Sequence, residues 1–180
     1  MHPESRREYS IEHATGLRID GGWELVEGEL RHLSPVGYLH ALVVAFIAQR
    51  LRAFVEAEGL GDVLAGDPGF VLRRGPDALR APDVCFLRAH RVSALPPRGF
   101  VDGAPDLSVE VVSPEDRWPE VERKARQFLE AGTVAVWAID PERRTARTYT
   151  HDGTSTLDED GVLEEPGLLP GFRLPLRDLP

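Results

Sequence analysis

The stretch APDLSVEVVSPEDRW, residues 104–118, gives the strongest indication of the fold of this chain. Residues 106–113, DLSVEVVS, are rich in valine and have too few polar residues for an exposed strand, which favours a central β-strand. Successive side chains of a strand point to opposite faces, so Asp106, Ser108 and Glu110 share one face. An unpaired buried carboxylate costs roughly several kcal/mol, so Glu110 is expected to be paired, capped or bound to a metal ion.

A second carboxylate lies in the stretch RAPDVCFLRAH, residues 80–90. Residues 82–87 are predicted to form a short strand, in which Asp83 shares a face with Cys85. If this strand neighbours the valine-rich one, Asp83 and Glu110 converge at one end of the sheet. A divalent cation between two carboxylates would offset the cost of burying them, and oxygen ligands suit Mg²⁺ or Mn²⁺.

Two long helices flank these strands in the sequence. Residues 34–59 carry apolar side chains at three- and four-residue spacing and end at Gly59, where a C-terminal cap is expected. Residues 113–132 form the second predicted helix, with Ser113 or Asp116 as its N-cap and Pro119 in its first turn. Further strands are predicted over 23–33, as a hairpin around Gly28, and over 62–73, 133–140 and 145–150. This order predicts an α/β (α+β) fold, a mixed β-sheet flanked by two main helices.

Lys124 is the single lysine of a chain that otherwise uses arginine for positive charge. It lies on the predicted second helix at the border of the apolar stripe, about 40° from Phe128. From there the ammonium can reach along the sheet toward Glu110 and orient or deprotonate a water, or stabilise a phosphoryl oxygen. The alternative is a surface lysine whose stem covers apolar side chains.

Composition limits the classes of function. A net charge of −9 argues against a protein that coats DNA through phosphate contacts, but it is compatible with an enzyme that recruits divalent cations. The one cysteine, Cys85, excludes an internal disulfide and a cysteine-based zinc site and fits a reducing cytoplasm. The N-terminus has no secretory segment, and LHALVVAFIA is too short to span a bilayer, so a cytoplasmic protein without a membrane partner is expected. We expect an N-terminal lead-in over residues 1–20 and a single domain over 21–180.

Several ordered blocks together resemble one family. They are WELVEGEL, APDVCFL, APDLSVEVVSPED, the segment from Lys124 through AGTVAVWAIDP, and LLPGFRLPL. The chain resembles the Uma-type family of bacterial proteins, which are assigned to the PD-(D/E)XK, or restriction-endonuclease-like, nuclease superfamily. The resemblance runs from about residue 20 to the C-terminus. It implies a restriction-endonuclease-like core with a magnesium-dependent phosphodiesterase site.

Residue roles follow from this resemblance. Asp83 would be the aspartate of the motif and a metal ligand, and Glu110 would be the second acid and second ligand. The lysine of the motif is missing because position 112 is valine, and the resemblance implies that Lys124 on the following helix replaces it. A further acid of the N-terminal part is expected at Glu29, with Glu27 as the second choice.

Two more residues have open alternatives. His40 is either a substrate or supporting contact or a partly buried helix histidine. Asp106 follows a proline and shares the face of Glu110, but a separation of some 13 Å along the strand disfavours a shared ion.

We therefore expect a metal-dependent nuclease acting on DNA, with Asp83, Glu110, Lys124 and Glu29 at its site and Mg²⁺ or Mn²⁺ as cofactor. Cutting both strands of a duplex favours a homodimer. The alternative is a protein of the same fold that binds nucleic acid or a partner without cutting. A small-molecule hydrolase has less support, because neither a G-x-S-x-G motif nor a Cys/His arrangement is present.

Overall fold

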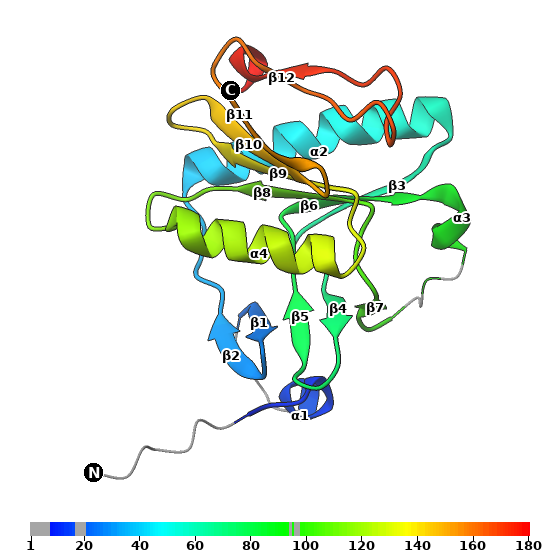
Figure 1. The fold of residues 1–180 in the computed structure, drawn as a ribbon, viewed down its shortest axis with the longest axis vertical. Helices are drawn as coiled ribbons and strands as arrows, with labels where there is room; N and C mark the ends of the chain where they lie inside the picture. The colour runs from blue at the N-terminus through cyan, green and yellow to red at the C-terminus, as the bar shows by residue number, and fades with distance from the viewer. Residues whose placement is uncertain (1–7, 17–20, 94, 96–97) are drawn as a thin grey trace.

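A six-stranded mixed sheet forms the centre of the molecule (Figure 1). The structure is a computed structural model, and it describes residues 8–16, 21–93, 95 and 98–180. In spatial order the strands are β11 (Gly153–Leu157), β10 (Thr145–Thr150), β9 (Ala135–Asp140), β8 (Leu107–Val111), β6 (Val84–Arg88) and β3 (Gly61–Ala65). Only the β8–β9 pair of this sheet is parallel. Helix α4 connects these two strands and returns the chain to the end of the sheet at which β8 begins, so β9 runs in the same direction as β8.

The two long helices cover opposite faces of this sheet (Figure 1). Helix α2 (Tyr38–Glu58) packs its buried side chains on the face that carries Trp137; these are Val43, Ile47, Leu51 and Val55. Helix α4 (Trp118–Glu130) packs Ala125 and Phe128 on the other face. The alternation of β8 divides its residues between these layers, so Glu110 faces the side of α4.

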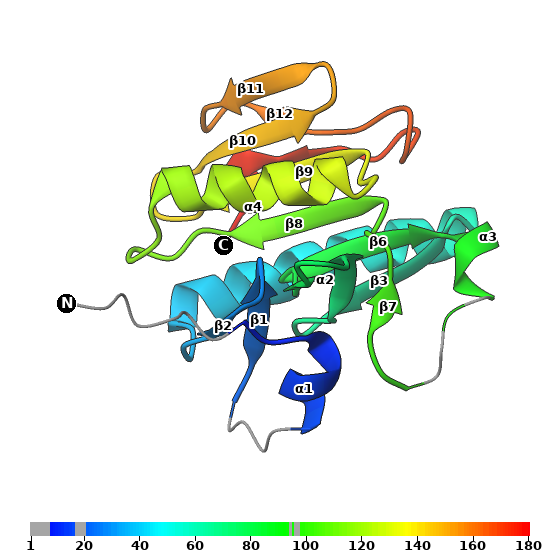
Figure 2. The ribbon, with the colours of Figure 1, turned by 60° about the horizontal axis from the view of Figure 1, so that its bottom comes forward.

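A smaller sheet lies at one side of the central sheet, where Figures 1 and 2 show β1 and β2 with α1 (Ile11–Gly16) at the far end. Its order is β2 (Glu29–His32), β1 (Trp23–Val26), β5 (Ala78–Arg80), β4 (Phe70–Arg73) and β7 (Val101–Asp102). Strands β5 and β6 follow each other closely, so the segment between them links the two sheets. This linker carries Asp83.

The remaining elements close the core. They are α3 (Ala89–Val92), the two-stranded pair β12 (Val162–Leu163) and β13 (Leu174–Pro175), and the 3₁₀ turn η1 (Leu176–Asp178). Leucines and Phe172 of this C-terminal segment join the cluster under α2. By length and composition α2 could also cross a membrane, but its apolar stripe is packed against the sheet as in a core helix.

The predicted fold class is confirmed, with some differences in detail. The described residues form three sheets rather than one, and the two-residue strand β7 and the short α3 and β5 were not predicted. The predicted N-cap of α4 was wrong: Arg117 is the N-cap, because the Asp116 carboxylate accepts from the Ser113 amide in the preceding turn. Within the expected lead-in, the structure describes α1, while residues 1–7 and 17–20 lie outside the described residues.

Candidate active site

Antiparallel pairing of β6 and β8 brings two carboxylates together. Val84 lies opposite Val109 and Cys85 opposite Ser108, so one further step places Asp83 opposite Glu110. The Val111 amide donates to Asp83 Oδ2 at 2.7 Å, which fixes the aspartate across the end of the strand pair. The predicted convergence of Asp83 and Glu110 at one end of the sheet is thus present in the structure.

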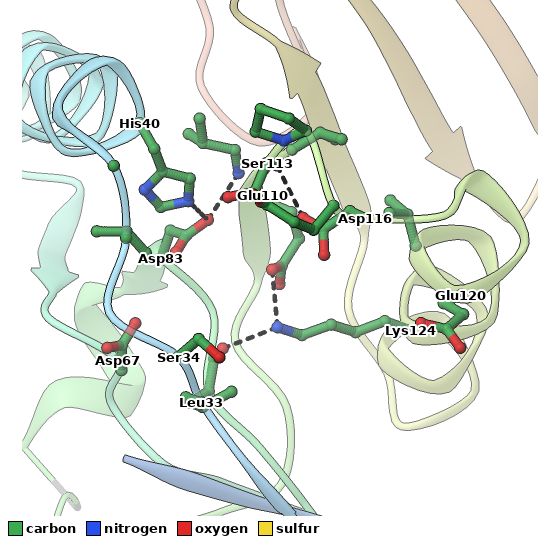
Figure 3. A pocket seen from close by; sticks show the side chains of 18 of the residues that line it. Leu33, Ser34, His40, Asp67, Asp83, Glu110, Ser113, Asp116, Glu120 and Lys124 are labelled. Atoms are coloured by element: carbon green, nitrogen blue, oxygen red, sulfur yellow. Dashed lines mark hydrogen bonds and ion pairs between the residues drawn. The ribbon is translucent and has the colours of Figure 1, made fainter. Parts of the chain in front are cut away.

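Lys124 on α4 reaches Glu110 and the carboxylate of a second buried glutamate, Glu24. Its Nζ donates to Glu110 Oε2 at 2.7 Å and to the carbonyl oxygen of Ala81 at 2.9 Å (Figure 3). It also lies 3.0 Å from Glu24 Oε1. Three oxygen atoms from three different segments therefore hold the ammonium. The position at the border of the apolar stripe gives the lysine this reach.

The acid contributed by the N-terminal part is Glu24 on β1. Only 4% of Glu24 is exposed, and its carboxylate accepts from Arg80 at 2.6 Å and from the Ala81 amide at 3.0 Å. Arg80 in turn donates to Gln127 Oε1 of α4 at 2.8 Å. This network joins β1, β5 and α4 directly beneath Lys124.

Glu29 and Glu27, the predicted N-terminal acids, are not among the described residues that line the pocket. Glu29 pairs with Val26 next to the hairpin turn, and Glu27 occupies that turn with a φ of 54°. The turn lies at the far end of the hairpin, where the carbonyl oxygen of Gly28 accepts a hydrogen bond from the Tyr9 amide and the Gly28 amide donates one to the carbonyl oxygen of Asp77. The hairpin direction therefore carries both side chains away from Lys124 and leaves Glu24 beside it.

The charges in the pocket strongly affect one another. Burial acts to raise the pKa of Glu24, but Lys124 and Arg80 outweigh it and lower that pKa to about 2. Burial raises the pKa of Glu110 to about 8, and the charge of Asp83 adds to this effect. Burial acts to lower the pKa of Lys124, but Glu110 and Glu24 outweigh it and raise that pKa. Lys124 is therefore a cation at neutral pH, which suits it to stabilise negative charge rather than to remove a proton.

The chemistry of the carboxylates fits a hard cation. Asp83 and Glu110 offer oxygen ligands, and burial raises the pKa of Glu110, so its ionised form needs positive charge nearby, which a cation would supply. Asp67, which lines the same pocket, also has a pKa raised by burial and by Asp83. Within the described residues, no three His, Cys, Asp or Glu side chains are arranged to hold a metal ion by themselves. A bound ion would need further ligands from water or substrate, as is common for Mg²⁺.

His40 and Asp106, whose roles the sequence left open, lie in different places relative to the pocket. His40 is buried and its Nε2 lies 3.4 Å from Asp83 Oδ2, so it supports that carboxylate from α2 (Figure 3). The hydrogen bond with Asp83 raises the pKa of His40. Asp106 instead accepts from the Arg88 amide and from Arg91, and it does not line the pocket. Asp106 is therefore a structural residue of the opposite end of β8.

The pocket is an open cavity between the two sheets and the starts of α2 and α4 (Figure 3). One wall consists of residues 31–40, and the other consists of residues 111–116 with the first turns of α4. Glu24, Asp83, Glu110 and Lys124 all line it. Carboxylates and a lysine ammonium thus share a cleft that a large substrate can reach.

Comparison with known proteins gives the family. Residues 15–177 match the family Uma2, described as "Putative restriction endonuclease". The chain belongs to the Uma2 family. No curated protein matches the chain. Among solved structures, it is similar to one from Anabaena variabilis described as "a putative nuclease belonging to DUF820", with a TM-score of 0.81 and 19% identity over 93% of this chain and 95% of that one. The fold of this Uma2 protein is therefore that of a restriction-endonuclease-like core, and the family supports a nuclease.

Glu24 makes an acid-sensitive contribution to the stability of this Uma2 protein. Its pKa in the folded protein, about 2, lies below the ordinary value of 4.5, so folding favours the charged carboxylate. The contribution, roughly 3 kcal/mol, is fully present above about pH 5 and is lost as the pH falls toward 2. Urea unfolding between pH 7 and pH 3 should show a steeper loss of stability for the wild type than for Glu24→Gln. If the free energy of unfolding fell equally with pH in the two proteins, the lowered pKa of Glu24 would be contradicted.

Proposed function

We propose that this Uma2 protein is a metal-dependent endonuclease that hydrolyses phosphodiester bonds in DNA. The observation that carries the proposal is the Lys124 ammonium at 2.7 Å from Glu110, on the same sheet end as Asp83. Two carboxylates and one cation, brought together from the linker before β6, from β8 and from α4, are a combination that phosphodiester hydrolysis uses. The family description supports the same class of reaction.

Asp83 and Glu110 are the residues that would hold Mg²⁺ or Mn²⁺. When bound, such an ion supplies positive charge to a phosphoryl oxygen and makes a coordinated water more acidic. Asp83 is prepared for this role because the Val111 amide and His40 already orient its Oδ2. Glu110 is oriented by Lys124 and by the Ser108 hydroxyl, which lies 3.3 Å from its Oε1.

Lys124 would stabilise the negative charge that develops on the phosphoryl group as water attacks the phosphorus atom. The reaction breaks one P–O bond, and the attacking water leaves its oxygen on phosphorus and a proton on the released hydroxyl. Glu24 and the Ala81 carbonyl keep the ammonium in place, so little reorganisation is needed when the charge develops. Their role is to position Lys124.

The test is cleavage of a supercoiled plasmid with Mg²⁺ or Mn²⁺. The wild type should nick or linearise the plasmid only when the ion is present, and Asp83→Ala should lose at least about a hundredfold in rate. Asp62→Asn is the matched control, because Asp62 is an exposed aspartate of β3 outside the pocket. Equal cleavage by the wild type and Asp83→Ala would rule out the proposed site.

A second candidate is a protein of the same fold that binds DNA or a partner without cutting it. It is favoured by the net charge of −9 and by the full set of acceptors that already engages Lys124. Calorimetric titration with Mn²⁺ separates the two candidates. The nuclease predicts metal binding that Glu110→Gln weakens, whereas the binding protein predicts no measurable heat from either protein.

A further inference from the structure

An exposed apolar patch lies at the mouth of the pocket. In the part of the chain that the structure describes, the exposed large hydrophobic side chains are Val36, Tyr38 and Leu42, with 53%, 82% and 37% of their surface accessible. All three come from one seven-residue stretch, the entry to α2 and its first turn. Their gathering beside the candidate active site is unlike the scattered single hydrophobics of an ordinary surface.

Tyr38 dominates this patch. It makes no hydrogen bond, ion pair or ring contact with any residue that the structure describes. Val36 and Tyr38 both line the pocket that Asp83 and Glu110 also line. His40, two residues later on the same helix, is buried and contacts Asp83, so Tyr38 points away from that contact. A flat aromatic ring is therefore presented to solvent at the rim of the cavity that holds the carboxylates.

Unpaired positive charge accompanies the ring. Arg31 and Arg123 line the same pocket, and neither forms an ion pair within the described ranges. The Nε of Arg123 is buried without a hydrogen-bond partner there. A ligand with both a flat apolar face and negative charges would complement the aromatic ring and these guanidinium groups together. A nucleotide has both features.

We infer that Tyr38 stacks on the base of an unpaired nucleotide next to the phosphodiester bond that is cut. In an intact duplex each base is covered on both faces by its neighbours, so the ring can only stack where the DNA is single-stranded or a nucleotide is splayed out. The inference rests on the proposed function and narrows its substrate class to DNA with an unpaired segment, such as a single strand, a flap or an end.

A second copy of the chain is a less suitable occupant for this patch. Stable interfaces involve roughly 20–30 residues on each side. The exposed large hydrophobic side chains of the described residues number three here, which is a small apolar area for such an interface. A homodimer formed here would also cover the opening of the candidate active site.

The test is binding of a fluorescently labelled 20-nucleotide single strand, and of the matching blunt duplex, followed by anisotropy in Ca²⁺. The wild type should prefer the single strand. Tyr38→Ala should weaken single-strand binding roughly tenfold and duplex binding less than about twofold, because stacking contributes only where a base face is free. Tyr38→Trp should stay within about twofold of the wild type. Leu42→Ala is the matched control, since Leu42 belongs to the patch but does not line the pocket.

Three results would overturn the inference. They are single-strand binding by Tyr38→Ala equal to that of the wild type, a wild-type preference for the duplex, and dissociation of a wild-type dimer by Tyr38→Ala in light scattering without a change in DNA binding. Failure of the proposed function would look different: the wild type would bind the single strand through Tyr38 without cleaving any DNA when Mg²⁺ is supplied.

Discussion

Lys124→Met is expected to reduce the rate of plasmid cleavage by roughly 10²–10³-fold, the loss typical of removing one preorganised group that stabilises developing charge. Methionine keeps the length of the apolar stem but removes the ammonium that contacts Glu110 and Glu24. The rate is measured at saturating Mg²⁺, so that a lower affinity for the ion does not contribute to the measured loss of rate.

Stability must be separated from catalysis in this experiment. Removing Lys124 leaves two buried carboxylates without one of their cations, and such a loss typically costs about 3–5 kcal/mol. Cleavage is therefore compared at a temperature at which circular dichroism shows both proteins folded. Arg126→Met is the matched control on the same helix, because Arg126 is exposed and, among the described residues, forms an ion pair with Glu122 alone. Folded Lys124→Met that cleaves at the wild-type rate would remove Lys124 from the mechanism.

Arg80→Met should lower the free energy of unfolding by about 3–5 kcal/mol, the cost of removing one partner of a buried ion pair. The Arg80 side chain is 5% exposed, lies 2.6 Å from Glu24 and also donates to Gln127, so β1 and α4 lose their common partner on β5. For a chain of this size the melting temperature should fall by about 6–20 °C. Equilibrium denaturation in urea measures the change.

An exposed pair provides the comparison for this loss. Arg52 and Glu56 are at a similar distance, 2.6 Å, but both side chains are mostly exposed on α2. Arg52→Met should therefore change the free energy of unfolding by less than about 1 kcal/mol. If Arg80→Met lowers the free energy of unfolding as little as Arg52→Met does, the buried network does not stabilise the junction of the two sheets.

The fold class and the burial of two carboxylates of the candidate site could be predicted because local patterns report burial directly. Alternating valines in residues 106–113 indicate a strand covered on both faces, and a carboxylate within such a strand implies a partner. The same reasoning places Asp83, because the residues after it are continuously apolar. Lys124 was located by its angle on the helix. The convergence of Asp83 with Glu110 also required that their two strands be neighbours, and the structure supplies that pairing.

The N-terminal acid was misplaced because its position depends on the direction of a hairpin relative to the other sheet. Three glutamates lie within six residues, and a hairpin pattern alone does not show which end of it meets the site. One clue was available: Glu24 lies within the apolar strand WELV, as Glu110 lies within its own strand, whereas Glu27 lies in the turn and Glu29 directly follows it. Tyr38 was also missed, since an exposed aromatic has meaning only once its neighbours are known.

Lys124 is held by groups from β1, from the linker before β6 and from β8, and α4 itself is followed by about fifty residues that complete the sheet and its cover. During synthesis on the ribosome, Glu24 and Glu110 thus emerge before the lysine that neutralises them. A polypeptide truncated before α4 would keep these acidic groups without their shared cation, so the balance of charge in the pocket would arise only at a late stage of folding.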